Sequence, residues 1–203
     1  QKFCVPGARA DAPDAATAEP LVNDVCPTLY PADVSEADVT AGRVVLIGSM
    51  QPLSGANAEK GPSRQRATFL AVKEVNELGG LNGRPLAVLA CDDGTSGNDV
   101  AVRAATHLVT VAHVPAIVGP AASSTTLQVF NEVTHAAHVL LISPSATAAT
   151  LTDQPDDGLI WRTAPPDTLQ GAAIAEWLKA RAFDKIAVVN RDDAYGRSEE
   201  HTS

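Results

Sequence analysis

Short, continuous apolar runs recur along the chain from residue 43 onward. They lie at residues 44–47, 87–90, 116–118, 139–142 and 186–189. The runs do not alternate with polar residues, which is typical of strands that are covered on both faces of a sheet. The pattern therefore predicts five buried strands, each followed by a polar loop.

Helical patterns separate these predicted strands. Apolar spacing predicts helices over residues 63–78, 98–112 and about 124–137, and a fourth that begins at Asp167. The first helix would bury one stripe, formed by Ala67, Leu70, Ala71, Val75 and Leu78. The second would bury Ala101, Ala104, Ala105, Leu108 and Ala112. Strand and helix in alternation favour right-handed crossovers, so the expected fold class is α/β with a doubly wound parallel sheet.

The first 42 residues differ from the rest. They hold five prolines, seven acidic and two basic residues, without sustained apolar periodicity. Such a segment buries too little surface to offset its ordering entropy, so we expect an extended acidic leader or linker. Cys4 and Cys26 lie within it, and a disulfide between them is one open possibility in an exported protein.

Composition narrows the function classes. The 203 residues carry a net charge of -9 and only 4% aromatic residues, which argues against nucleic acid as a partner. No run approaches the roughly 20 apolar residues that a membrane helix needs. The sequence begins at Gln1, and residues 197–203 read as the translation of a sequencing-library adapter. We expect the natural protein to continue beyond Gly196, with any export signal upstream; a natural polar C-terminus is the alternative.

The loops after the predicted strands are the candidate binding positions, because ligands bind at the carboxyl ends of the strands in an open α/β sheet. Residues 119–126 and 143–148 are both rich in serine and threonine. Hydroxyl and N–H groups that open a helix suit a carboxylate, although an N-cap needs only one such residue. For Asp92 and Asp93, turn and cap roles are favoured over ribose binding or phosphorylation.

Patterns for catalysis and cofactors are weak. The sequence has no G-x-S-x-G elbow, no G-x-G-x-x-G fingerprint and no P-loop. His135 and His138 are interpreted as a solvated helix face, since no third metal ligand lies beside them. Cys91 is interpreted as a small core residue. We therefore expect no cofactor, no metal and no enzymatic activity.

Seven segments occur in an order that resembles a known family. They are Ile47-Gly-Ser-Met-Gln-Pro-Leu-Ser-Gly55, Asn76-Glu-Leu-Gly-Gly-Leu-Asn-Gly-Arg84, Asp92-Asp93, Ile117-Val-Gly-Pro120, Ile142-Ser-Pro-Ser-Ala-Thr147, Arg162-Thr-Ala-Pro165 and Ala194-Tyr-Gly196. Over about residues 43–196 the chain resembles the leucine/isoleucine/valine-binding proteins, which are type I periplasmic substrate-binding proteins of ABC transporters. The resemblance implies two lobes that close on a ligand. Residues 43–165 would form most of the first lobe and residues 166–196 the start of the truncated second.

The resemblance also implies ligand-binding residues. Ser123, with Ser124 beside it, falls where members hold the ligand's α-carboxylate. Ser145 and Thr147 fall where a backbone carbonyl and a threonine bind the ammonium and carboxylate groups. Tyr195 matches a tyrosine that faces the cleft, and Asp167 lies at the hinge crossing.

Two departures concern the pocket wall. Thr95 and Ala122 stand where the well-known branched-chain binders carry a disulfide, and Lys60 replaces an aromatic residue that is often found in the first loop. The resemblance therefore leaves the ligand's side chain open. It implies a periplasmic protein, exported either free or with a lipid anchor, that captures a small amino acid or related metabolite and delivers it to an ABC transporter membrane permease. The alternatives are a ligand-sensing receptor domain of the same fold and a nucleotide-dependent α/β enzyme.

Overall fold

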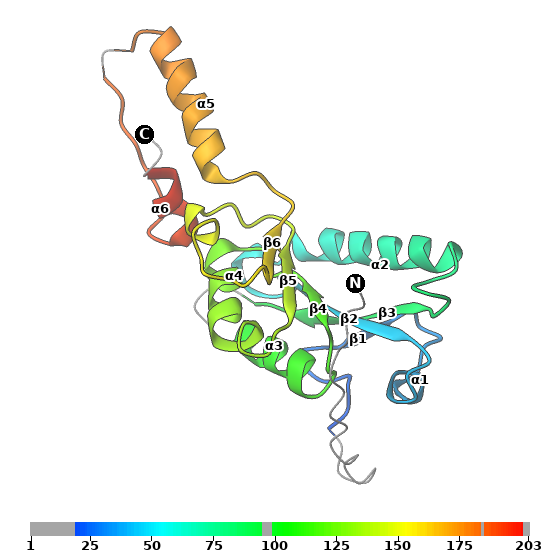
Figure 1. The fold of residues 1–203 in the computed structure, drawn as a ribbon. Helices are drawn as coiled ribbons and strands as arrows, with labels where there is room; N and C mark the ends of the chain where they lie inside the picture. Colours follow the sequence, from blue (N-terminus) through cyan, green and yellow to red (C-terminus); the bar gives the residue numbers. More distant parts are fainter. Residues whose placement is uncertain (1–18, 95–98, 184, 201–203) are drawn as a thin grey trace.

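A six-stranded sheet forms the centre of the computed structural model, which describes residues 19–94, 99–183 and 185–200 (Figure 1). The strand order is β1-β3-β2-β4-β5-β6. The strands are β1 (Thr28–Tyr30), β2 (Val45–Gln51), β3 (Leu86–Asp92), β4 (Ala116–Val118), β5 (Leu140–Ser143) and β6 (Ile160–Arg162). All neighbours pair in parallel except β1 and β3, which are antiparallel. The predicted α/β class with a mainly parallel sheet is confirmed, and β1 and β6 are additions that the apolar runs did not indicate.

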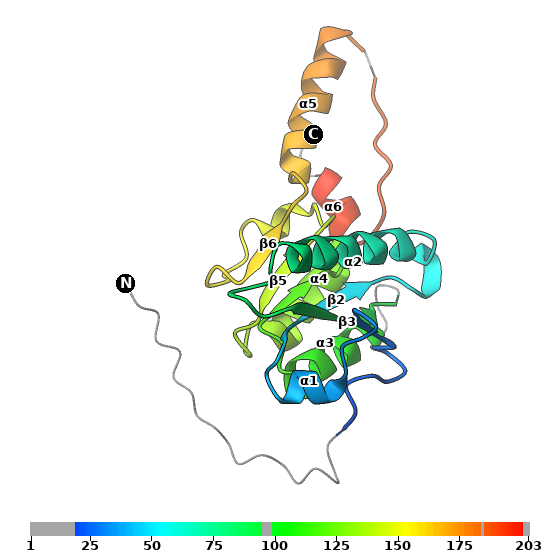
Figure 2. The ribbon, with the colours of Figure 1, turned by 90° about the vertical axis from the view of Figure 1, so that its right-hand side faces the viewer.

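Helices cover both faces of the sheet (Figure 2). One face packs against α2 (Gly61–Glu77), and the other against α3 (Val100–Thr110) and α4 (Ser123–Val129), which continues as a π-helical turn over Phe130–Thr134. The remaining helices are α1 (Glu36–Thr40), α5 (Asp167–Ala180) and α6 (Ala194–Glu200), and short 3-10 turns lie at Gly55–Asn57 and Ala149–Leu151.

The main core lies between the sheet and α3. All five residues of the predicted α3 stripe are buried. They pack with β-strand residues such as Leu89, Ile117 and Leu141. The continuous apolar strands are thus covered on this face as the pattern predicted.

The predicted stripe of α2 is wrong except for Val75, which packs toward the sheet. Leu70 and Leu78 are 55% and 89% exposed, whereas Val72 is buried at 1%. Val72 packs with Phe69 and Val75, and the ring of Phe69 stacks on Tyr30 of β1 with 4.4 Å between centroids. The spacing of residues 69, 72 and 75 is also helical. The aromatic side chain of Phe69 offers more surface to bury than Ala67 or Ala71.

The segment before β2 is not an unpacked leader over its described part. Leu21, Val25 and Cys26 belong to the main core. Cys26 forms a disulfide with Cys91 at the end of β3, and the N–H of Asp92 donates to the Val25 carbonyl at 2.8 Å. The Cys4–Cys26 bond, which the sequence left as one possibility, is therefore wrong, because Cys26 pairs with Cys91. Cys4 lies outside the described residues. Cys91 is buried, as expected, but as half of a cystine.

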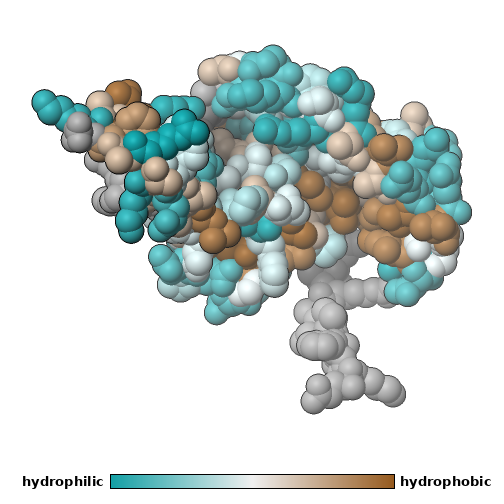
Figure 3. Space-filling view, turned by 90° about the horizontal axis from the view of Figure 1, so that it is seen from above, coloured by the Kyte–Doolittle hydropathy of each residue, from teal (hydrophilic) through white to brown (hydrophobic). Residues whose placement is uncertain are grey.

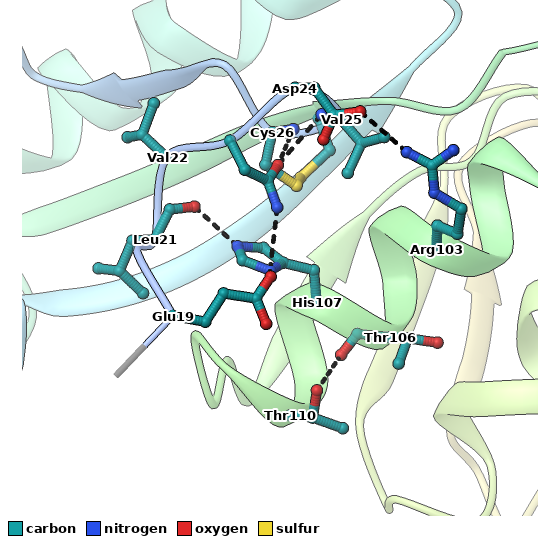
Figure 4. A network of polar contacts seen from close by, with 12 residues as sticks. Glu19, Leu21, Val22, Asp24, Val25, Cys26, Arg103, Thr106, His107 and Thr110 are labelled. Atoms are coloured by element: carbon teal, nitrogen blue, oxygen red, sulfur yellow. Dashed lines mark hydrogen bonds and ion pairs between the residues drawn. A yellow bond between two sulfur atoms is a disulfide. The ribbon is translucent and has the colours of Figure 1, made fainter. Parts of the chain in front are cut away.

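Polar contacts from α3 hold the same segment (Figure 4). His107 is 5% exposed, and its Nε2–H donates to the Leu21 carbonyl oxygen at 2.8 Å. Its Nδ1 lies 3.2 Å from both Asn23 Nδ2 and Glu19 Oε1. The amide can donate to a neutral ring, and a charged ring can donate to the carboxylate, so either protonation state has a partner.

The C-terminal part projects from the lobe. Helix α5 stands away from the sheet in Figures 1 and 2, and its apolar residues Ile174 and Trp177 are about half exposed, at 48% and 50%. The predicted strand at 186–189 is wrong: this segment pairs with no strand of the described sheet, and Val189 is 95% exposed. A strand needs a neighbour for its backbone groups, and the described chain offers none here.

An open hollow of about 720 Å³ lies between α5 and the 186–190 segment. Apolar side chains line much of it, including Ile174, Leu178, Ile186 and Val188. Hydrophobic atoms on this projecting part are visible at the left of Figure 3. This part of the described chain therefore leaves apolar side chains exposed.

Candidate functional site

Four loops meet at the carboxyl ends of β2, β3, β4 and β5 and enclose two adjoining polar pockets. We call the first, of about 130 Å³, the serine pocket; Asn57, Ala121, Ala122, Ser123, Ser124, Ser145, Arg191, Asp193 and Tyr195 line it. We call the second, of about 100 Å³, the basic pocket; Pro52, Asn57, Lys60, Arg64, Asp93, Gly94, Ala121, Ala122, Thr125 and Ser145 line it. The two share four lining residues, so they form one divided cleft where an α/β sheet places its ligand.

Close packing of backbone brings these loops together. Gly119 ends β4 with a φ of 116°, and a Cβ there would lie 2.0 Å from the Met50 carbonyl oxygen of β2. Gly61 opens α2, and a Cβ there would lie 1.9 Å from the Pro52 carbonyl oxygen. Only glycine fits at either point, which explains how the loops after β2 and β4 reach the same cleft.

Hydroxyl groups tie the loop after β4 to the loop after β5. Ser123 Oγ accepts hydrogen bonds from the N–H groups of Thr147 at 3.2 Å and Ala148 at 3.3 Å. Ser145 donates its hydroxyl to the Ala121 carbonyl at 2.8 Å, and Ser143 donates to Pro120 at 2.6 Å. The two hydroxyl-rich loops therefore hold each other in place.

Thr147 differs from these serines. Its Oγ1 is buried and has no hydrogen-bond partner among the described residues. Its backbone is fully engaged, because its N–H donates to Ser123 and its carbonyl accepts from the N–H of Asp167 at 2.9 Å. A buried hydroxyl without a partner costs free energy, and a bound ligand is one way to satisfy it.

The structure brings together most of the sequence-predicted site. Ser123, Ser124, Ser145 and Tyr195 line the serine pocket, with Tyr195 contributed by α6. Thr147 lies directly behind Ser123. Asp167 does not join them: its carboxylate is 1% exposed, without a hydrogen-bond partner among the described residues, and it borders the apolar hollow under α5.

Several pocket residues were missed from the sequence. Asn57 and Arg64 lie in or beside the first loop and have no motif of their own, and Arg191 and Asp193 form an ion pair of 2.7 Å in the serine pocket. Lys60 was identified only as a departure from the family pattern. The signal available for Arg64 was its position one turn into the helix that follows the first loop.

The paired aspartates have different environments. Asp92 Oδ1 accepts from the N–H groups of Leu53, Ser54 and Gly94, a turn-forming role as expected. Desolvation acts to raise the pKa of Asp92, but hydrogen bonds from the Ser54 side chain and from these N–H groups outweigh it and lower the pKa.

Asp93 is 4% exposed and lines the basic pocket. Desolvation raises its pKa to about 7; the neighbouring Asp92 adds to the rise, whereas the Ala121 N–H and the Arg64 charge oppose it. Asp93 therefore exchanges a proton near neutral pH inside the candidate site, which the turn interpretation did not predict.

The remaining candidate chemistry lies elsewhere. His135 is paired with Asp157 at 3.0 Å on the molecular surface. Within residues 19–94, 99–183 and 185–200, no three His, Cys, Asp or Glu side chains gather as a metal site. Across the same ranges, every helix is too short or too polar to cross a bilayer.

A doubly wound lobe with a polar cleft at its strand ends defines a ligand-binding domain of the α/β class. The family model described as "Periplasmic binding protein" matches residues 44–202, so the chain belongs to the periplasmic binding protein family. The "Leucine-, isoleucine-, valine-, threonine-, and alanine-binding protein" of Pseudomonas aeruginosa is 32% identical over 157 residues, which are 77% of this chain and 41% of that protein. The "Chemotactic signal transduction system substrate-binding protein BasB" of Halobacterium salinarum is 35% identical over 164 residues, 77% of this chain and 39% of that protein.

Solved structures show the same fold. The branched-chain amino acid transporter substrate binding protein LivJ of Streptococcus pneumoniae, in complex with isoleucine, has a TM-score of 0.65 at 29% identity, over 78% of this chain and 45% of that chain. A solute binding protein of Rhodopseudomonas palustris, in complex with 3,4-dihydroxy benzoic acid, has a TM-score of 0.69 at 22% identity, over 79% of this chain and 42% of that chain. The chain spans about two fifths of the length of the curated relatives it matches.

Proposed function

We propose that this chain forms the first lobe, and the beginning of the second, of an extracytoplasmic protein that captures a small amino acid or a related metabolite. The observation that carries the proposal is the serine pocket, where hydroxyl groups of α4 and of the loop after β5 converge with Tyr195. Membership of the periplasmic binding protein family supports it.

The pocket offers matched groups for a zwitterion. Ser123 Oγ already accepts two N–H groups, which leaves its own hydroxyl proton to donate to a carboxylate. The buried Thr147 hydroxyl is not part of the pocket lining, but it lacks a partner among the described residues and would provide a second donor to a ligand that reaches it. As the resemblance implies, the Ser145 carbonyl would accept from the ligand's ammonium group. Charged groups that leave water need such partners.

The rest of the proposed function concerns the intact protein. A completed second lobe would cover the apolar hollow under α5 and close on the ligand. Closure that favours the bound state shifts the population without bond making, so the protein would act as a binder and not as an enzyme. We propose a periplasmic location and an ABC transporter membrane permease as the partner, since relatives of this kind are named as transporter binding proteins.

A sensing role is the second candidate. The relative from Halobacterium salinarum is named as a substrate-binding protein of a chemotactic signal transduction system. The same closed lobe pair would then be recognised by a receptor instead of a permease. Co-purification of the intact, ligand-loaded protein with membrane partners separates the two roles.

Calorimetric titration of the intact protein with the standard L-amino acids tests the binding proposal. Ser123→Ala and Thr147→Val should each weaken the best ligand by about tenfold to 150-fold, the effect of losing a hydroxyl that bonds a charged group. Thr110→Ala is the control, because this exposed hydroxyl bonds only its own helix, to the Thr106 carbonyl. Wild-type affinity in both site variants would contradict the proposal, as would chemical conversion of the bound ligand.

A further inference from the structure

The basic pocket adjoins the serine pocket directly. Asn57, Ala121, Ala122 and Ser145 line both. A ligand whose amino-acid group lies in the serine pocket therefore directs its other end into the basic pocket. The chemistry of that second pocket determines which ligand end it can accept.

Two cations lie at the start of α2 in this pocket. Lys60 is the N-cap residue and Arg64 lies in the first turn, which contains no acidic residue. The N-terminus of a helix of 17 residues already carries positive partial charge, so cations there disfavour the helix. The arrangement makes sense as a site that attracts an anion.

These cations have few partners within the protein. Lys60 pairs with Glu59 at 3.9 Å, and both side chains are more than half exposed, so this pair is weak. Arg64 forms no ion pair with any residue that the structure describes. Arg64 as a residue is partly buried and lines the pocket. It is available to bind a carboxylate in a bidentate manner.

Among the described residues that line the pocket, Asp93 is the one acidic side chain. Its burial raises its pKa to about 7. A protonated carboxyl group does not repel an anion, and it can donate a hydrogen bond to one. Thr125, which is 2% exposed, adds a hydroxyl group to the same wall.

We infer that the basic pocket binds an acidic group at the far end of the ligand, so that the preferred ligand is an amino acid or related metabolite with a second carboxylate. The inference rests on the proposed function and names its ligand class. An aliphatic end would desolvate Arg64 and Asp93 without giving them a partner. A cationic end would face Lys60 and Arg64.

The test compares ligands of matched length on the intact protein by calorimetric titration. The probes are L-glutamate, L-glutamine and L-norvaline, with L-aspartate, L-asparagine and L-2-aminobutyrate as the shorter set. The acidic member of at least one set should bind about tenfold or more tightly than its aliphatic counterpart, as expected for a charge-assisted contact.

Variants assign that preference to the pocket. Arg64→Gln and Lys60→Gln should each reduce the affinity for the acidic probe and leave the aliphatic probe unchanged. Arg66→Gln is the matched control, because Arg66 lies on the same helix but is exposed and outside both pockets. Lys60 is exposed, so its variant reports on binding even where Arg64→Gln impairs folding.

The outcomes separate the two proposals. Tighter binding of the aliphatic probes, with no effect of Arg64→Gln or Lys60→Gln, would overturn the acidic-ligand inference and leave the proposed function standing. Absence of binding by every amino acid of the panel would overturn the proposed function, and the inference with it.

Discussion

The hydroxyl oxygen of Ser123 accepts hydrogen bonds from the backbone N–H groups of Thr147 and Ala148, 3.2 and 3.3 Å away. Ser123 is 3% exposed and lies at the first position of α4. One side chain thus joins two loops that follow neighbouring strands. Its role is structural, and under the proposed function it also binds the ligand; the sequence could not separate these two roles.

Ser123→Ala should therefore lower stability even without ligand. The variant leaves two N–H groups without their acceptor, at a cost of about 1 to 3 kcal/mol in the free energy of unfolding. Ser124→Ala is the matched control, because the Ser124 hydroxyl lines the same pocket and forms neither of these bonds. Denaturant unfolding of both variants checks the difference, and equal midpoints would show that Ser123 does not tie the loops.

Thr147→Val should have the opposite signature. Valine has nearly the same shape, and it removes a buried hydroxyl that has no partner among the described residues. Stability without ligand should stay the same or rise by about 1 kcal/mol, while ligand affinity falls. Thermal melts with and without ligand measure both effects, and a clear loss of ligand-free stability would assign the hydroxyl a structural partner instead.

The sequence predicted the parts of the fold that depend on local periodicity. The strands at residues 116–118 and 139–142, and the buried stripe of α3, required only continuous or helically spaced apolar residues. The stripe of α2 failed because two helical spacings compete on that helix, and the one with Phe69 packs better. Long-range contacts decided that choice.

The parts that were missed depend on contacts between distant segments. The strand β1 has three residues, and its pairing with β3 and the Cys26–Cys91 disulfide span a separation that no local pattern reveals. The loops of the serine pocket were predictable because serine and threonine concentrate after strands. The basic pocket was not, because it depends on how closely Gly61 packs against Pro52.

Loss of the disulfide should unfold the N-terminal segment and destabilise the lobe. The bond joins cysteines 65 residues apart, and the chain-entropy relation for a loop of that length gives about 4 kcal/mol. A reducing agent should lower the unfolding midpoint of the wild type. The double variant Cys26→Ala with Cys91→Ala should have this lower unfolding midpoint even without the reducing agent.

The same double variant provides the control for nonspecific effects of the reducing agent. Its midpoint should not respond, because it cannot form this bond. Two outcomes would contradict this prediction: an unchanged unfolding midpoint of the wild type after its disulfide has been reduced, or a double variant as stable as the wild type. Either would show that the hydrogen bonds of His107 and β1 hold the segment without the disulfide.

The carboxyl group of Asp93 should make both stability and ligand binding depend on pH near neutrality. Its pKa is about 7 in the folded protein, against 3.8 for an unperturbed aspartate side chain. Between these two pH values the folded state binds more protons than the unfolded chain, so this group makes the free energy of unfolding decrease as pH rises. The resulting decrease in the free energy of unfolding amounts to up to about 4 kcal/mol and is complete above pH 7.

Asp93→Asn should remove this dependence and raise ligand-free stability at pH 8 relative to the wild type. Asp92→Asn is the control of opposite sign, since the pKa of Asp92 is lowered and its charge is stabilised by the loop N–H groups. Denaturant midpoints from pH 5 to 8 distinguish the two variants. If the wild type and Asp93→Asn changed in parallel across this range, Asp93 would not titrate there.

The affinity for an acidic ligand should also depend on the protonation of Asp93. Below pH 7 the protonated carboxyl of Asp93 is a third hydrogen-bond donor for the ligand, beside Lys60 and Arg64. Above pH 7 its negative charge lies in the same pocket and offsets the positive charges of these two residues. The affinity for the preferred acidic probe should therefore decrease as pH rises from 6 to 8, by about tenfold per unit at most. The Asn variant should bind with little change over this range, because its amide keeps a donor in place without gaining charge. An affinity that increases with pH in the wild type would mean that ionised Asp93 itself receives a cationic or hydrogen-bond-donating end of the ligand.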